Sequence, residues 1–249
     1  MNSTKDQSNV SPVPGTWDEF LGVMKRLETV VGLTHRRRLA NGNVPFRQSV
    51  RELIQADRSL SWLEQLYPFI DIRNAYAHNP ALHPPALIPS LELINEAWAL
   101  YERLHNPKKV LDRFKQDAKV VVIRPETKLM AVLKFINGKD FSQFPVVVDN
   151  KVVGLLTEKT ISRWLAAAVT TKESTELSRT TINDIIRLQS IATDNYRVVG
   201  QKELADSVAR LFVDVISLEA VIIVRDAQSQ SGVCGIVTTW DVMNTGSVQ

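Results

Sequence analysis

The stretch FPVVVDNKVVGLLTEKT, residues 144–160, decides the fold of the C-terminal half of the chain. Its runs PVVV and KVVGLL are short, β-branched and bounded by turn residues, which predicts two strands joined as a hairpin. The segment GLLTEKT then leads from the second strand into a helix-like stretch, KTISRWLAAAV. A related segment, GIVTTWD, stands at residues 235–241, so the surrounding unit is expected to occur twice.

Two copies of this unit are predicted, at residues 118–170 and 180–245. The first copy contains VVVI and TKLMAVLKFI ahead of the hairpin, and the second contains KELADSVARLFVD ahead of EAVIIV and GVCGIV. Each copy gives a strand, a polar turn, a helix, a hairpin and an ending of the form G-h-h-T-x-x-D or G-h-h-T-x-x-T, where h is apolar. Strands that alternate with helices predict an α/β domain, and the copies are expected to pack about a pseudo-twofold axis.

The polar side chains of the second ending that could bind a ligand are those of Thr238 and Asp241. These residues are three apart, so they share one face at the start of a helix. A threonine there can donate to an anion bound at the helix N-terminus, and an aspartate can accept hydroxyl groups such as those of a ribose. The same pair is equally a helix N-cap with an acid in the first turn, which needs no ligand. In the first ending the corresponding residues are Thr157 and Thr160, so the carboxylate is missing.

The strands and endings together resemble a tandem CBS-domain pair over roughly residues 110–245. This resemblance implies a regulatory adenine nucleotide (AMP, ADP or ATP), with no resident cofactor and no metal. By the resemblance, Asp241 would hold the ribose, Thr238 and Thr239 the phosphates, and Val221 and Ile236 the base. The ligand is expected on the Asp241 side, because the first ending has no carboxylate.

Residues 16–117 have a different pattern of apolar residues, which predicts an all-α helical bundle. The predicted fold class is therefore two-domain, with a helical bundle followed by an α/β repeat pair. TWDEFLGVMKRLETVVGL opens with Thr16 and Glu19 in capping-box spacing, and its apolar residues recur at three and four positions. The segment FRQSVRELIQADRSLSWLEQLY and a third segment from Leu91 toward Phe114 continue this pattern. Residues 1–15 are polar and contain proline, so we expect a disordered lead-in without a secretory signal.

A second candidate site, RNAYAH, lies at residues 73–78 of the helical half. Arg73, Asn74 and His78 place a cation, an amide and an imidazole close together on a helix, where arginine can hold phosphate and histidine can move a proton. The string R-N-x-x-x-H within an all-α unit resembles the HEPN family. That resemblance implies a metal-independent endoribonuclease, with RNA as substrate and a homodimer that joins two copies of the motif.

Simpler interpretations of these basic residues stay open. His78 can meet the dipole of a helix C-terminus, with Arg73 paired to Asp71 or Glu64 and the helix stopped at Asn79-Pro80. The run from His35 to Arg38, HRRR, is likewise expected to be a solvated helix end.

Composition narrows the class of protein. Hydrophobic residues make up 44% and charged residues 23%, which is ordinary for a soluble globular protein, and a net charge of +3 argues against a strongly basic nucleic-acid binder. No apolar run approaches the length needed to cross a membrane, and the single cysteine excludes an internal disulfide or a zinc cluster. A cytoplasmic protein is expected.

Three functions are compatible with these features. In the first, an adenine nucleotide bound to the CBS pair regulates a helical effector, an RNase, through a helix that runs from Leu91 into Phe114. In the second, the protein is a non-enzymatic regulator whose helical domain only dimerises or docks a partner. In the third, both domains are scaffold and bind no ligand.

Overall fold

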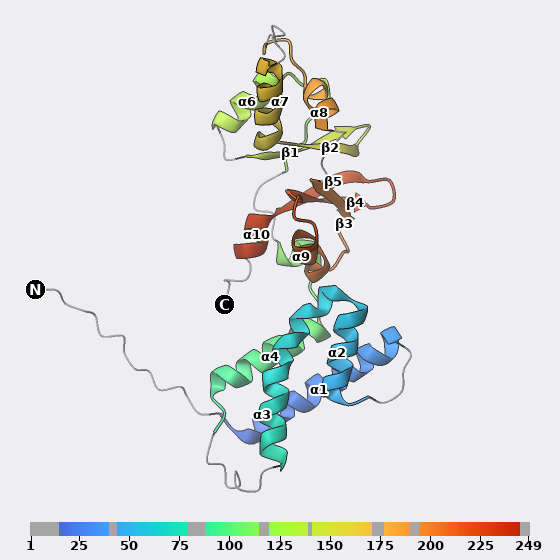
Figure 1. The fold of residues 1–249 in the computed structure, drawn as a ribbon. Helices are drawn as coiled ribbons and strands as arrows, with labels where there is room; N and C mark the ends of the chain where they lie inside the picture. Colours follow the sequence, from blue (N-terminus) through green and yellow to red (C-terminus); the bar gives the residue numbers. More distant parts are fainter. Residues whose placement is uncertain are drawn as a thin grey trace, which may run out of the picture. The chain divides into compact units, whose positions relative to one another are not determined.

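The chain forms two compact units, Met1–Pro107 and Lys108–Gln249, in a computed structural model (Figure 1). The structure describes residues 15–39, 44–78, 88–114, 120–138, 141–170, 177–189 and 195–244. Most of the expected lead-in, residues 1–14, lies outside these ranges, as do Asn79 and Pro80. Within them, no helix has the length and apolar character that a membrane span requires.

The first unit is helical, as predicted. Its first helix is capped as the sequence indicates, because Thr16 N and Thr16 Oγ1 both donate to Glu19 Oε2 at 2.9 Å. The apolar stripe of this helix is buried at Phe20, Val23 and Leu27, which pack against the other helices of the unit. The elements are α1 Trp17–Leu39, α2 Phe46–Ala56, the 3-10 helix η1 Arg58–Gln65, α3 Leu66–His78 and α4 Leu91–His105.

The second amphipathic segment is broken where the sequence suggests a continuous pattern. Asp57 leaves the helical region with φ −144° and ψ 102°, and its Oδ1 accepts hydrogen bonds from Ser59 N at 2.9 Å and Ser59 Oγ at 2.7 Å. A side chain that satisfies the free N–H groups of the next turn favours a new start over continuation. The chain therefore enters η1 at Arg58 instead of prolonging α2.

The helix expected from Leu91 to Phe114 is also interrupted, so that prediction is wrong. Helix α4 ends at His105, and Pro107 follows, which has no N–H to donate and restricts the residue before it. The short helix α5, Val110–Arg113, belongs to the second unit, where Val110 N donates to Glu203 O at 2.8 Å. Val110 and Phe114 are buried there, so the helical unit ends at Pro107 rather than at residue 117.

The second unit is α/β, with one sheet in the order β1-β2-β5-β4-β3 (Figure 1). Strands β1 and β2 form the predicted hairpin, and the positive φ angles of Asp149 (48°) and Asn150 (64°) fit the tight turn between antiparallel strands. Strand β4 pairs parallel with β3 and antiparallel with β5, and Lys151 of β2 pairs with Ser231 of β5. The strands are β1 Gln143–Val148, β2 Lys151–Thr157, β3 Tyr196–Gly200, β4 Ala220–Asp226 and β5 Ser231–Thr238.

Helices cover the strands of each repeat. In the first repeat, α6 and α7 pack with β1 and β2 around Phe144, Leu156 and Trp164 (Figure 1). Helix α8 lies within residues 180–245, expected for the second copy, but its Ile182 and Ile185 pack in this same cluster. In the second repeat, α9 packs with α5 on β4 and β5. The helices are α6 Leu129–Gly138, α7 Glu158–Thr170, α8 Ile182–Gln189, α9 Ala205–Asp214 and α10 Thr239–Asn244.

A further apolar cluster joins the two repeats. Val152 and Leu155 of the first repeat pack with Ala220, Ile222 and Val224 of β4. Strand β4 is therefore buried on both faces, which explains why its sequence is a continuous apolar run. This shared cluster fixes how the two endings approach each other.

Candidate ligand-binding site

A pocket of about 400 Å³ lies between the two endings of the repeat pair. The first ending contributes the end of β2 and the start of α7, and the second contributes the end of β5 and the start of α10. Segments just before β1 and β4 complete the wall. The lining residues are Ser142, Gln143, Thr157, Glu158, Lys159, Leu218, Glu219, Thr238, Thr239 and Trp240.

The second ending is a helix cap. Asp241 Oδ2 accepts hydrogen bonds from Thr238 N and Thr238 Oγ1, each at 2.7 Å, and Asp241 N donates to Thr238 Oγ1 at 3.4 Å. These reciprocal bonds are those of a capping box, and α10 begins at the next residue, Thr239. The carboxylate therefore faces Thr238, and Asp241 does not line the pocket.

The first ending repeats this arrangement with a hydroxyl in place of the carboxylate. Thr160 N donates to Thr157 Oγ1 at 3.2 Å, and the two threonine hydroxyl oxygens are 2.9 Å apart. Both side chains are buried, and Thr157 lines the pocket whereas Thr160 does not. Either hydroxyl of this pair can be the donor, and where Thr160 donates, the Thr157 hydroxyl keeps its own proton for another acceptor.

The two apolar residues expected to flank a base do not share a face of the sheet. Val221 is fully buried in the cluster beneath α9, whereas Ile236 packs in the cluster between the repeats. In the β4–β5 register, Val221 is opposite Val237 and Ile222 is opposite Ile236, so Val221 and Ile236 alternate across the sheet. Neither residue lines the pocket.

The pocket contains an ion pair that links the repeats. Lys159 Nζ lies 3.0 Å from Glu219 Oε1, with Lys159 in the first turn of α7 and Glu219 immediately before β4. Sequence reasoning missed both residues. Lys159 stands inside the quoted ending GLLTEKT, but nothing along the chain indicates that Glu219 is its partner.

The aromatic residue Trp240 forms part of the same wall and is 72% exposed. It lies off the face shared by Thr238 and Asp241, and its exposed indole borders the pocket. Packing of Trp240 between domains or subunits stays a prediction.

The second candidate site keeps its three residues near one another on α3. Arg73 Nη1 donates to Asn74 Oδ1 at 2.9 Å, and Arg73 Nη2 lies 3.2 Å from Glu28 Oε2 of α1. Arg73 thus pairs with Glu28 rather than with Asp71 or Glu64. His78 is the last residue of α3 and is exposed, one helical turn beyond Asn74.

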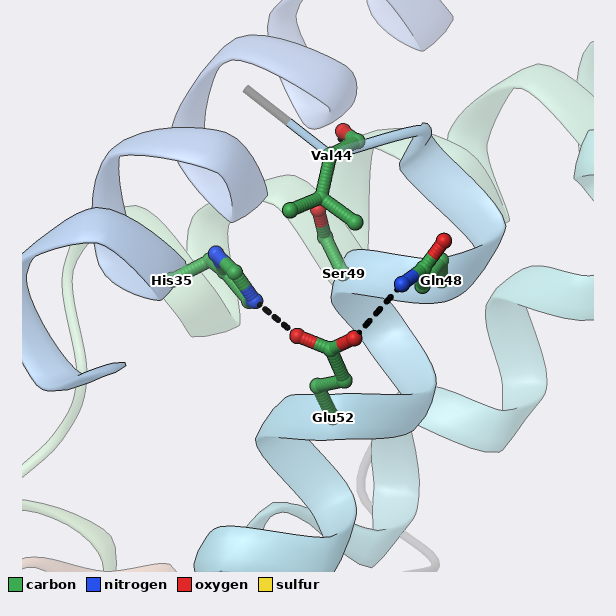
Figure 2. A network of polar contacts seen from close by, with 5 residues as sticks. All are labelled: His35, Val44, Gln48, Ser49 and Glu52. Atoms are coloured by element: carbon green, nitrogen blue, oxygen red, sulfur yellow. Dashed lines mark hydrogen bonds and ion pairs between the residues drawn. The ribbon is translucent and has the colours of Figure 1, made fainter. Parts of the chain in front are cut away.

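The basic run at the end of α1 is not simply solvated. His35 is 1% exposed, and its Nε2 lies 2.7 Å from Glu52 Oε2 (Figure 2). Gln48 Nε2 donates to the other carboxylate oxygen at 2.7 Å, and this bond, followed by the bond with His35, lowers the pKa of Glu52 below its ordinary value. Arg38 pairs with Asp57, so these residues tie α1 to α2 and to the start of η1. They are structural, which corrects the expectation for His35.

The described ranges hold no group of three His, Cys, Asp or Glu side chains close enough together to bind a metal ion.

Comparison with known families and structures bears on the α/β unit. The CBS domain family model matches residues 116–167, which supports the predicted resemblance for the first repeat. No curated protein matches the sequence.

Solved structures with a similar fold include three CBS proteins. The CBS domain of a membrane protein from Sphaerobacter thermophilus is 20% identical, with 61% of this chain and 95% of that chain covered and a TM-score of 0.44. CBSX2 in complex with AMP is 19% identical, with 56% and 96% covered and a TM-score of 0.42. The CBS domain pair of protein MJ0100, in complex with 5′-methylthioadenosine and S-adenosyl-L-methionine, is 21% identical, with 57% and 97% covered and a TM-score of 0.42.

Proposed function

We propose that the α/β unit binds an adenine nucleotide in the pocket between the two endings, and that the bound nucleotide regulates the helical unit. The observation that carries this proposal is that corresponding residues of the two endings, Thr157 and Thr238, line one pocket. Its volume, about 400 Å³, lies within the range of small-molecule sites. The CBS domain match in the first repeat supports a regulatory role.

Each ending supplies a hydroxyl donor for the phosphates in this proposal. Thr157 donates from the first ending, because Thr160 can satisfy its acceptor side. Thr239 donates from the second ending, where it is exposed and lines the pocket. Asp241 is a positioning residue, because it holds Thr238 and with it the start of α10. Trp240 offers an exposed aromatic face on which an adenine can stack.

Calorimetric titration of the full chain with AMP, ADP and ATP tests the proposal. At least one nucleotide is expected to bind, and Thr239→Val is expected to weaken it because a phosphate donor is lost. Thr170→Val is the matched control, since Thr170 lies at the end of α7 and bonds only locally to Ala167 O among the contacts described for it. Absence of binding by all three nucleotides would remove the proposal.

A second candidate function is favoured by the arrangement at RNAYAH. We propose that the helical unit cleaves RNA without a metal, as part of a homodimer that brings two copies of the motif together. In this reaction His78 takes the proton of a ribose 2′-hydroxyl, whose oxygen attacks the adjacent phosphorus as the bond to the 5′ oxygen breaks. The departing 5′ oxygen takes a proton from water, which leaves a 2′,3′-cyclic phosphate and a 5′-hydroxyl. Arg73 stabilises the charge that develops on the phosphate oxygens. Its bond to Glu28 is weakly held, because both side chains are at least one-third exposed (34% and 43%).

Incubation of labelled RNA with the protein and excess EDTA tests this second function. His78→Ala is expected to abolish cleavage, and His105→Ala is expected to leave it unchanged. His105 suits the comparison because it is an exposed histidine of the same unit that stacks on Tyr101. Equal cleavage by the unaltered protein and His78→Ala, or none by either, would favour a non-enzymatic regulator whose helical unit dimerises or docks a partner.

A further inference from the structure

We propose that Lys159 is the cation that selects a phosphorylated ligand in the inter-repeat pocket, and that Glu219 competes with the ligand phosphate for it. This inference rests on the proposed nucleotide site and deepens it, because it states which part of a nucleotide the pocket recognises. A nucleoside 5′-phosphate would bind in preference to the corresponding nucleoside.

Lys159 is the more mobile of the two paired side chains. Lys159 and Glu219 both line the pocket, and Lys159 Nζ lies 3.0 Å from Glu219 Oε1. The lysine side chain is 55% exposed, whereas Glu219 is 20% exposed and its backbone N–H donates to Asn195 O at 2.7 Å. The ammonium is therefore the member of the pair that can move to a ligand, because Lys159 has the longer and more exposed side chain.

The pocket wall has few positive charges to offer a phosphate. Among the described lining residues, Lys159 is the single cation, and Glu158 and Glu219 are carboxylates. While Lys159 is paired with Glu219, the wall presents a negative balance that disfavours a phosphate. A phosphate bound here must draw Lys159 toward itself, since Thr157 and Thr239 contribute only neutral donors.

The two side chains also differ in exposure. Lys159 is 55% exposed and loses little when it leaves the pair, whereas Glu219 is 20% exposed and loses its cation. That loss is the competition that the ligand phosphate must overcome. A phosphate with nearly two negative charges makes stronger charge-assisted hydrogen bonds than a single carboxylate. Exchange of partners is therefore favourable for a phosphorylated ligand and gives nothing to an uncharged nucleoside.

Calorimetric titration with AMP and with adenosine tests this inference on the full chain. Lys159→Gln is expected to weaken AMP binding about tenfold, the effect of one charge-assisted hydrogen bond, and to leave adenosine within about twofold. Glu219→Gln removes the competitor and is expected to tighten AMP binding several-fold, again without change for adenosine. Lys202→Gln is the matched control, because Lys202 is an exposed lysine of the same unit outside the pocket.

The outcomes separate this inference from the function on which it rests. If AMP and adenosine bind the unaltered protein but Lys159→Gln affects both equally, or neither, the role of Lys159 is overturned and the nucleotide site stands. If neither compound, nor ADP or ATP, binds the unaltered protein, the nucleotide site is overturned and this inference with it. Thermal melts of each variant establish that the fold is intact. Because Lys159 is half-exposed, its variant is expected to fold even if Glu219→Gln does not.

Discussion

At the scale of the residue, the two endings differ at one position, which is Asp241 in the second ending and Thr160 in the first. Both place a capping threonine at the end of a strand, and Asp241 or Thr160 closes the local turn three residues on. The carboxylate of Asp241 accepts a hydrogen bond from the Thr238 hydroxyl, whereas the hydroxyls of Thr157 and Thr160 bond to each other with either as donor. The ending without an acid can therefore offer the Thr157 hydroxyl as a donor, and in the proposed function the ligand contacts both endings.

Substitution of Asp241 shows whether its carboxylate holds Thr238 in place or contacts the ribose of the ligand. Asp241→Ala removes the acceptor for Thr238 and is expected to cost about 1 kcal/mol of unfolding free energy, whereas Asp241→Asn keeps an acceptor and costs less. Denaturant unfolding measures both. If Asp241 only positions Thr238, the affinity ratio of AMP to 2′-deoxy-AMP is the same in Asp241→Asn as in the unaltered protein. A ratio that falls to one in Asp241→Asn would instead place the carboxylate on the ribose.

Glu52 is expected to make the stability of the helical unit depend on pH in the acid range. Its hydrogen bonds with Gln48 and His35 lower its pKa from 4.5, so the folded state holds the carboxylate ionised more strongly than the unfolded state does. The resulting stabilisation is present above pH 4.5 and is lost as the pH falls through the lower folded value. Melting temperatures between pH 3 and pH 7 should therefore fall more steeply for the unaltered protein than for Glu52→Gln. Parallel curves for the two proteins would contradict this.

At the scale of the element, features that depend on neighbouring residues could be predicted from the sequence, whereas contacts between distant segments could not. The capping box at Thr16, the α1 stripe and the β1–β2 hairpin were predictable because each depends on residues that are close in sequence. The break at Asp57 was missed because the apolar spacing continues across it while a single side chain decides the outcome. The pair Lys159–Glu219 could not be predicted, because it depends on how two repeats pack.

The break at Asp57 should be sensitive to its side chain. Asp57→Ala removes the cap of η1 and the ion pair with Arg38, and is expected to cost about 1–2 kcal/mol of unfolding free energy. Asp71→Ala is the matched control, because Asp71 forms an exposed ion pair with Arg47 and caps no described helix, so its loss should cost well under 1 kcal/mol. Guanidinium unfolding of the two variants measures the difference. Equal costs would show that the cap at Asp57 does not stabilise this turn.

At the scale of the whole molecule, the change in apolar pattern along the chain predicted two units, and the repeated strand and helix segments predicted the repeat pair. The position of the boundary was not, because α5 looks like an extension of the helical half but packs in the α/β unit through Val110 and Phe114. The pocket was predictable only in part. The threonines of both endings were identified, but their meeting in one pocket follows from the shared apolar cluster between the repeats.

We propose one nucleotide site shared by the two repeats rather than one site in each repeat, and the stoichiometry of binding distinguishes these arrangements. Titration with the tightest-binding adenine nucleotide should give one nucleotide per chain. Thr157→Val and Thr239→Val should each weaken that one binding event, while Thr157→Ser and Thr239→Ser, which keep the hydroxyl, should preserve it. Two independent binding events per chain, one sensitive only to Thr157 and the other only to Thr239, would contradict the claim.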